Sequence, residues 1–424
     1  MNIELTQQAR EILLANDRGG FTVPTARLYP YQWNWDSAFV ALGFATFDRN
    51  RAWRELELLV EGQWPDGMIP HILFRRDDPD YFPGPSVWKA DLGPVPSGGI
   101  SQPPVLASVM LELVESGDER DFERADALFD AALKWHSWWH DARTPDGCPA
   151  VCTVHPWESG RDNSPDWDIG LDQMEVRSDL EPYERMDTKH ADASQRPSKL
   201  QYDKYVSIIM AGRASQWDQK RLTNAGPFLM ADPGIHFILL RADRDLLKLA
   251  EMLGRDGDAS ILRDHIEKGE IASDFFWNAR FQAFCARDVR SEVFSDGFSS
   301  ASALCFYASA GTSKQRAASY GHIQRIGEQV AYLMPSWDPG AGSFQPQRYW
   351  CGPLWPQMNT IIAKGLGEQG HDALAQRVRG DLAACIRKSG FRECFDPLSG
   401  DGCIGTNFSW TAAMWLAQTQ GDGA

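Results

Sequence analysis

The chain has 424 residues, of which 43% are hydrophobic and 24% are charged, a composition typical of a globular protein. Its 58 acidic and 42 basic side chains give a formal net charge of −16. That balance argues against a partner with exposed phosphates, either nucleic acid or an anionic membrane surface, because both attract clusters of Lys and Arg.

The N-terminal residues and the cysteines indicate a cytoplasmic protein. Residues 1–6 (MNIELT) lack the basic and apolar regions of a signal peptide, and no run of 18 apolar residues would span a membrane. The eight cysteines form no CxxC pair, although Cys394 and Cys403 lie close enough in sequence to be a chance pair. We therefore expect buried, reduced thiols.

Hydrophobic residues recur at positions i, i+3, i+4 and i+7 along the chain and predict about a dozen helices. In chain order, the expected helices cover residues 4–16, 36–47, 50–62, 103–116, 119–141, 200–213, 232–253, 257–275, 297–310, 313–330, 355–368, 371–388 and 408–419. The best strand candidate is a short hairpin within residues 279–294.

Long loops rich in Gly, Pro, Asp and Trp separate the helices, at residues 17–35, 63–102, 143–196 and 335–354. Loops of this length in a compact domain usually carry function. Together the pattern favours an all-α fold in one domain over residues 1–424, a double ring of helices known as an (α/α)6 toroid barrel. A helical solenoid is the alternative, but it predicts short and similar loops.

The loops contain aromatic residues and carboxylates suited to a sugar site, and many of the 17 Trp lie there. The segment Tyr29–Asp36 leads into a helix, where Asp36 is either an N-cap or a carboxylate that grips a sugar. Tyr81 and Gln102 lie in two further loop segments and either reach a cleft or are ordinary loop residues.

Two acidic segments could supply the pair of carboxyl groups that glycoside hydrolysis needs. His155–Asp168 carries four carboxylates, at Glu158, Asp162, Asp166 and Asp168, some of which we expect to be caps or solvated charges. An Asp beside Trp157 in an enclosed pocket would have a raised pKa, as a general acid requires. Glu393 follows a helix much later in the chain, and is either a surface residue or the second catalytic carboxylate.

These loops, taken in order, resemble those of glycoside hydrolase family 63, particularly its short bacterial members that hydrolyse mannosylglycerate and glucosylglycerate. The resemblance runs from Tyr29–Asp36 to Arg392–Trp410, and its most specific element is Glu-Ser-Gly-x-Asp at residues 158–162. It implies an (α/α)6 barrel whose insertions, at about 63–102 and 143–196, form a lid over the active site. It also implies hydrolysis with inversion and without a metal or organic cofactor.

The resemblance further implies a role for individual residues. Asp162 matches the general acid and Glu393 the general base. The sugar would be held by residues at the positions of Tyr29, Trp33, Asp36, Gln102, Trp157 and Trp350, while Tyr81 and Tyr349 match lid and aglycone contacts.

The expected substrate is a small-molecule α-glucoside or α-mannoside such as glucosylglycerate or mannosylglycerate. The segment at residues 406–409 (TNFS) has no long amide side chain for a glycerate carboxylate, and Arg161, Arg348 and Arg392 are candidates for it by position. The sequence leaves open the choice between glucose and mannose and whether the chain forms a homo-oligomer.

Several other functions remain open on the sequence. One is an α-glucosidase acting on glucosylglycerol or on an α-linked disaccharide or oligosaccharide. Another is a sugar epimerase or isomerase on the same barrel, which would need paired histidines; His71 and His155 are the histidines in these loops. A non-catalytic sugar-binding protein and a lyase are weaker alternatives.

Overall fold

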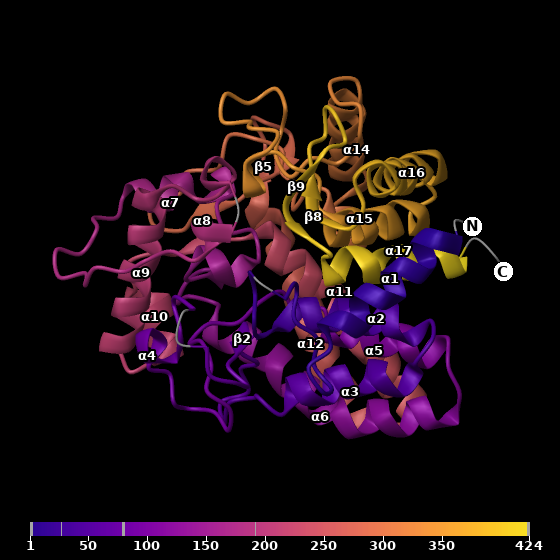
Figure 1. Ribbon diagram of the computed structural model, residues 1–424. Helices are drawn as coiled ribbons and strands as arrows, with labels where there is room; N and C mark the ends of the chain where they lie inside the picture. Colours follow the sequence, from indigo (N-terminus) through magenta and orange to yellow (C-terminus); the bar gives the residue numbers. More distant parts are fainter. Residues whose placement is uncertain (1–2, 27, 79–80, 191, 422–424) are drawn as a thin grey trace.

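The computed structural model describes residues 3–26, 28–78, 81–190 and 192–421, and most of them are helical (Figure 1). Twelve of the thirteen expected helices are confirmed, with ends that differ by a few residues. They are α1 (Ile3–Asn16), α2 (Asn34–Ala45), α3 (Arg49–Val60), α5 (Leu106–Glu115), α6 (Glu119–Ala142), α9 (Lys199–Ala214), α11 (Pro233–Leu253), α12 (Asp256–Ala272), α14 (Ser313–Gly327), α15 (Pro356–Glu368), α16 (Asp372–Ser389) and α17 (Ser409–Gly421).

The prediction of a helix over residues 297–310 was wrong, because only α13 (Leu304–Tyr307) forms there. The backbone N–H groups of the serines before α13 donate to partners that a helix would not offer. The Ser300 N–H donates to the Ser336 carbonyl (3.1 Å) and the Ser299 N–H donates to the Ser302 hydroxyl (3.1 Å). Contacts of this kind replace the hydrogen bonds that a helix would make.

The helices pack against one another in a regular succession. Six of them contact in the order α2, α5, α11, α13, α15, α17 and back to α2. Others pack on these six: α1 and α3 on α2, α6 on α5 and α11, α12 on α11, and α16 on α15. One cluster of buried hydrophobic side chains extends from Ala9 in α1 to Leu416 in α17.

The strands are short and lie at the ends of loops. β1 (Gln32–Trp33) pairs with β2 (Ile72–Leu73), and β8 (Arg392–Phe395) pairs with β9 (Gly402–Thr406). The hairpin expected within residues 279–294 is only partly present. Within this range, Arg287 and Phe294 form an antiparallel bridge. β6 (Ala283–Phe284) pairs with β5 (Trp277–Asn278), while β7 (Arg287–Asp288) also pairs with β4 (Met230–Ala231), which pairs with β3 (Cys152–Thr153).

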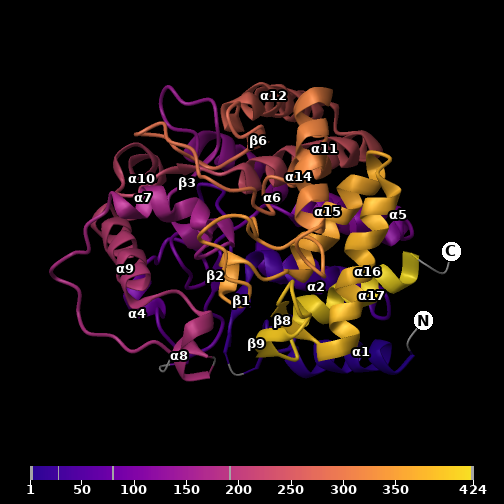
Figure 2. The same cartoon turned by 90° about the horizontal axis from the view of Figure 1, so that it is seen from above.

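The two expected insertions carry short helical elements. α4 (Pro85–Trp88) lies in the first, and the second contains the 3-10 helices η1 (Pro156–Ser159), η2 (Pro165–Trp167) and η3 (Ala193–Gln195) with α7 (Asp168–Asp172) and α8 (Asp187–His190). With α9 and α10 (Gln219–Ala225), these helices gather on the side of the molecule away from both chain ends (left in Figures 1 and 2). The insertions therefore meet in space although they are far apart in sequence.

Two expectations from the composition concern the cysteines and the membrane. All eight cysteines are free, and seven of them are buried, as the sequence predicts. Cys394 and Cys403 face each other across β8 and β9. Among the described residues, no helix combines the length and the apolar character that crossing a membrane requires.

Candidate active site

One pocket collects the two catalytic carboxyl groups and the eight substrate-binding residues that the family resemblance implies. Its lining includes Tyr29, Trp33, Asp36, Tyr81, Gln102, Trp157, Asp162, Tyr349, Trp350 and Glu393. These residues come from loops, from β1 and β8, from the start of α2, and from the 3-10 helices η1 and η5 (Tyr349–Cys351). The fold therefore brings together segments more than three hundred residues apart. Both insertions contribute to the lining, the first with Tyr81 and the second with Trp157 and Asp162.

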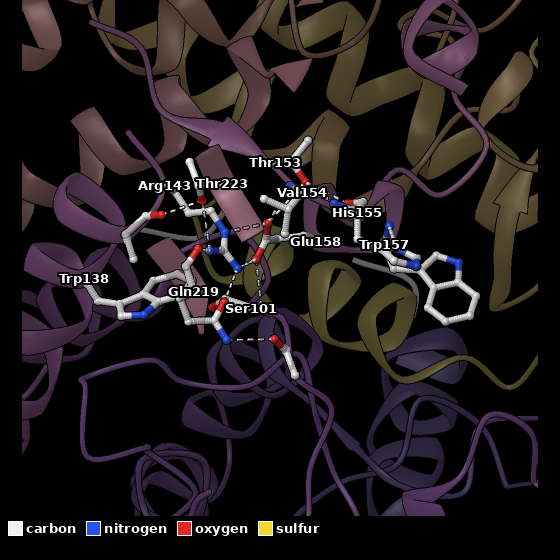
Figure 3. Close-up of polar contacts among 12 residues, drawn as sticks. Ser101, Trp138, Arg143, Thr153, Val154, His155, Trp157, Glu158, Gln219 and Thr223 are labelled. Carbon is white, nitrogen blue, oxygen red and sulfur yellow. Dashed lines mark hydrogen bonds and ion pairs between the residues drawn. The ribbon is translucent and has the colours of Figure 1, made fainter. Parts of the chain in front are cut away.

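Glu158 lies outside the pocket lining and forms a buried ion pair with Arg143 (Figure 3). Arg143 donates from Nε to Oε2 and from Nη2 to Oε1, both at 2.9 Å, and the two side chains are fully buried. The backbone N–H groups of Ser101 and Val154 donate to the same carboxylate, each at 3.0 Å. Figure 3 shows Trp157 extending away from this network. Glu158 thus fixes the acidic segment to its neighbours.

Asp166 and Asp168 also lie outside the pocket lining. Asp166 accepts a hydrogen bond from Arg161 Nη1 (2.5 Å) and one from the Ser295 hydroxyl (2.8 Å), so it is an anchor. Asp168 is the first residue of α7, and burial raises its pKa to about 6. Of the four carboxylates in this segment, Asp162 is therefore the one that faces the pocket.

The turn before Asp162 requires a glycine. Gly160 has a φ of +68°, a conformation that side chains with a Cβ disfavour. A Cβ at this position would lie 2.6 Å from Cζ2 of Trp35, another residue of the pocket wall. The Glu-Ser-Gly-x-Asp spacing thus lets the chain turn against an indole ring and direct Asp162 inward.

The Asp162 carboxyl is in an environment that favours its protonated form. Burial raises its pKa from 3.8 to about 7, while the positive charge of Arg196 opposes the rise and the charge of Glu393 adds to it. Its main-chain carbonyl accepts a hydrogen bond from the Tyr205 hydroxyl (2.8 Å), which holds the backbone in place. A carboxyl group that keeps its proton near neutral pH is suited to act as a general acid.

Glu393 is completely buried in β8 and has partners that favour its charged form. The Tyr29 hydroxyl donates to Oε1 (3.1 Å), the Gly405 N–H donates to Oε2 (3.2 Å), and Arg196 Nη1 lies 4.0 Å from Oε1. Burial still raises its pKa to about 7, against the effect of Arg196 and these hydrogen bonds. Because donors stabilise a carboxylate, Glu393 is better placed than Asp162 to carry a negative charge.

Arg196 is a pocket residue that the sequence did not nominate. It follows η3, donates from Nε to Asp187 Oδ2 (3.0 Å) and from Nη1 to the Tyr29 hydroxyl (2.9 Å), and its guanidinium carbon lies 4.2 Å from the centre of the Tyr349 ring. Only 5% of the residue is exposed. An arginine in a loop with no helical or strand pattern gives no sequence signal for this placement.

The prediction that Arg161, Arg348 or Arg392 binds a substrate carboxylate was wrong, because none of these arginines lines the pocket. Arg161 is buried between Asp166 and Asp232, with the Nη2 to Asp232 Oδ1 distance at 2.6 Å. Arg348 donates to Gln201 Oε1 (3.1 Å), and Arg392 donates to the Gly402 carbonyl (3.4 Å).

Asp36 is not an N-cap, although the sequence allowed that role. The residue that precedes α2 is Trp33, and Asp36 is the third residue of the helix and is buried in the pocket wall. Burial raises the pKa of Asp36 well above its ordinary value, and the nearby charge of Glu393 adds to the effect. The start of the helix is held instead by Gln102, whose Oε1 accepts a hydrogen bond from the Trp35 N–H (3.3 Å).

Aromatic side chains form the walls around these polar groups. Trp33 contacts Tyr29 and Tyr81 edge to face, with ring centres 5.3 and 6.0 Å apart. On another wall, Trp350 stacks on Trp355 with ring centres 3.9 Å apart. The Trp350 N–H donates to Asn163 Oδ1 (2.9 Å), which ties this wall to the residue after Asp162. Flat aromatic surface beside carboxylates is typical of a sugar site.

The comparisons with known proteins agree with this geometry. Residues 29–411 match the family described as "Mannosylglycerate hydrolase MGH1-like glycoside hydrolase domain". The chain belongs to this branch of glycoside hydrolase family 63. The resemblance seen in the sequence is thereby confirmed, and the chain is a glycoside hydrolase.

Three relatives show how far the similarity to this family extends. A mannosylglycerate hydrolase of Thermus thermophilus is 42% identical over 419 residues, which cover 97% of this chain and 100% of that protein. The glucosylglycerate hydrolase of Mycolicibacterium hassiacum is 30% identical and covers 97% of both chains. A crystal structure of a family 63 mannosylglycerate hydrolase from Thermus thermophilus, in complex with Tris and D-glycerate, aligns with a TM-score of 0.93 at 42% identity, over 98% of this chain and 100% of that one.

The two loop histidines, His71 and His155, do not form the pair that an epimerase would need in this pocket. His71 lines the pocket, but His155 does not, and its Nε2 lies 3.2 Å from the Tyr205 carbonyl. Burial lowers the pKa of both imidazoles to about 3, so both are neutral at physiological pH. The structure therefore gives the epimerase alternative no acid–base pair among these loop histidines.

Proposed function

We propose that this family 63 enzyme hydrolyses an α-linked glycosylglycerate, either mannosylglycerate or glucosylglycerate, with inversion at the anomeric carbon. The observation that carries the proposal is a buried arginine, Arg196, beside the buried Glu393 carboxyl group in an aromatic pocket that Asp162 also lines. The names of the relatives, which include both mannosylglycerate and glucosylglycerate hydrolases, support the same substrate class.

In the proposed reaction, Asp162 is the general acid and Glu393 is the general base. Asp162 gives its proton to the glycosidic oxygen as the bond from that oxygen to the anomeric carbon breaks, and glycerate leaves. Glu393 accepts a proton from a water molecule whose oxygen attacks the anomeric carbon from the opposite face. An inverting enzyme needs roughly 6.5–9.5 Å between its two carboxyl groups to admit that water. Proton exchange with solvent restores both groups.

Arg196 is the group we assign to the glycerate carboxylate. A guanidinium held by Asp187 and stacked on Tyr349 is oriented before the substrate arrives, so little freedom is lost on binding. Charge-assisted hydrogen bonds to a carboxylate are among the strongest that a protein makes. Tyr81 and Tyr349 line the pocket and supply hydroxyl groups for the aglycone.

The sugar itself would bind between the aromatic walls. Trp33, Trp157 and Trp350 offer ring surface for the CH groups of a pyranose, and Asp36 and Gln102 offer oxygen atoms for its hydroxyl groups. Glucose and mannose differ only in the orientation of one hydroxyl group, so both remain within the proposal.

We further propose that the helices form an (α/α)6 barrel in one domain, covered by the two insertions as a lid. The succession of contacts through six helices supports an inner ring, and a hydrophobic cluster that extends from α1 to α17 supports one domain. The insertions both reach the pocket, which supports their role as a lid.

The proposal is tested by a release assay on mannosylglycerate, glucosylglycerate, glucosylglycerol, trehalose and kojibiose side by side. We expect free glycerate from one or both of the first two substrates and slower or no release from the others. Asp162→Asn and Glu393→Gln should each lower kcat by about 10²–10⁴-fold while sugar binding, followed by tryptophan fluorescence, survives. Fast hydrolysis of trehalose or kojibiose alone, or near-normal turnover in either variant, would refute the assignment.

A further inference from the structure

A second group of titratable side chains lies outside the pocket, where α6, α11 and α12 contact one another. α6 supplies His136 and His140, one helical turn apart, α11 supplies Asp243, and α12 supplies His265. Asp243 Oδ2 lies 2.8 Å from His140 Nε2, and Oδ1 lies 2.8 Å from His136 Nδ1. The rings of His140 and His265 are stacked with their centres 4.2 Å apart.

We propose that His140, Asp243 and His265 form a binding site for a divalent transition-metal ion, best suited to Zn²⁺. One ligand atom from each of the three residues lies within 4.8 Å of the other two. Around a tetrahedral zinc ion with bonds of about 2.0 Å, neighbouring ligand atoms are about 3.3 Å apart, so small side-chain movements complete the site. Two imidazoles and a carboxylate favour zinc over calcium or magnesium, which prefer oxygen ligands alone.

The unpaired ring nitrogen of His265 is one independent observation that points to a bound ion. The residue is 7% exposed, and its Nδ1 is buried without a hydrogen-bond partner in the part of the chain that the structure describes. That nitrogen faces Asp243 Oδ1 at 3.9 Å, too far for a hydrogen bond. A buried imidazole nitrogen that has no partner is available to bind a metal ion.

The second observation in favour of a bound ion is that the negative charge of Asp243 has only histidines as ion-pair partners among the described residues. Its side chain is fully buried, and within the described residues all its ion-pair partners are histidines, which are positive only when protonated. A buried carboxylate whose partners are histidines alone lacks the permanent positive charge that usually compensates it. A divalent ion would supply that charge.

His136 fits the role of an orienting residue around the ion. With its proton on Nδ1, it donates to Asp243 Oδ1 and leaves Oδ2 for the metal, an arrangement that commonly fixes ligating carboxylates. His140 would bind through Nε2 as the tautomer protonated on Nδ1. Its side chain is 14% exposed, which gives the ion a path from solvent and a water as fourth ligand.

The proposed ion is structural rather than catalytic, because none of the four residues lines the active-site pocket. It would link three helices of the scaffold, and binding to the folded state alone would stabilise the fold. This role is separate from the expectation that hydrolysis itself needs no metal.

Zinc binding to the metal-stripped full chain, measured by calorimetry, tests the site. We expect one Zn²⁺ per chain, a higher Tm with Zn²⁺ than with Mg²⁺, and the visible absorption of tetrahedral Co²⁺ when cobalt replaces zinc. His265→Gln should weaken zinc binding by about 100-fold or more and His136→Gln by about 10–100-fold. His265→Cys, which loses the same imidazole packing but keeps a zinc ligand, should retain tight binding.

His371→Gln is the matched control, because His371 lies at the start of α16, away from the cluster, and packs on Tyr320. It should bind zinc like the unmodified chain. If His265→Gln does not fold, His140→Asn replaces it, since His140 lies at the more exposed edge of the cluster. Absence of one-site zinc binding in the unmodified chain would overturn the proposal. So would zinc binding by the His265→Gln or His140→Asn variant that is as tight as that of the unmodified chain.

Discussion

Replacing Asp162 with asparagine should make the protein more stable at alkaline pH even as it removes the proposed general acid. Asparagine has nearly the same shape as aspartic acid but cannot lose a proton. Burial raises the pKa of Asp162 from 3.8 to about 7, so the folded state holds this proton more tightly than the unfolded state. The carboxyl group therefore lowers the free energy of unfolding as the pH rises from about 4 through 7.

The magnitude follows from the pKa difference. Each pKa unit corresponds to about 1.4 kcal/mol, so full ionisation of Asp162 costs the folded protein up to about 4 kcal/mol. At pH 5, ionisation of Asp162 lowers the free energy of unfolding of the unmodified chain by only about 1.6 kcal/mol. The stability advantage of Asp162→Asn should thus grow by roughly 2–3 kcal/mol between pH 5 and pH 8.

Urea unfolding of both proteins at pH 5, 6, 7 and 8 measures this difference. Asp91→Asn, at an exposed loop position, is the control and should give a nearly constant difference from the unmodified chain. An Asp162→Asn advantage that does not change with pH would show that Asp162 is not held protonated. It would also remove the physical basis for assigning it the role of general acid.

Three further substitutions test other parts of the site. Glu158→Gln breaks the buried pair with Arg143 and should lower the free energy of unfolding by about 3–5 kcal/mol in urea titrations; a loss below about 1 kcal/mol would contradict the anchoring role. Arg196→Gln removes a charge that lowers the pKa of Glu393, so the acidic limb of the kcat/KM profile should move to higher pH and KM for a glycosylglycerate should rise; an unchanged profile and KM would exclude both roles. Gly160→Ala places a Cβ against Trp35 and should cost about 1–3 kcal/mol of stability and lower kcat; wild-type behaviour would disprove the steric argument.

Sequence reasoning worked best where the physical signal is local. The long helices were predictable because their apolar stripes repeat every three or four residues, and the exception, residues 297–310, failed because serines and a neighbouring loop take up the backbone hydrogen bonds. The hairpin of β8 and β9, which presents Glu393, has strands of only four and five residues, too short for a clear alternating pattern.

The site was predictable in its members but not in its arrangement. The acidic segment offered Asp162 together with three other carboxylates as the general acid. Glu158 is excluded from this role by its ion pair with Arg143, at the end of α6. Arg196 could not be recognised, because its position depends on Tyr29, Tyr349 and Glu393, which come from three distant parts of the chain. Partners that meet only in the folded protein leave no periodic trace in the sequence.

The most direct test of the central claim is a proton NMR time course of mannosylglycerate hydrolysis, repeated with glucosylglycerate. We expect glycerate to appear together with the β-anomer of the free sugar, before mutarotation produces the α-anomer. In Asp162→Asn and Glu393→Gln, this release should be slower by about 10²–10⁴-fold. Release of the α-anomer first, or no glycerate from either substrate, would contradict the claim.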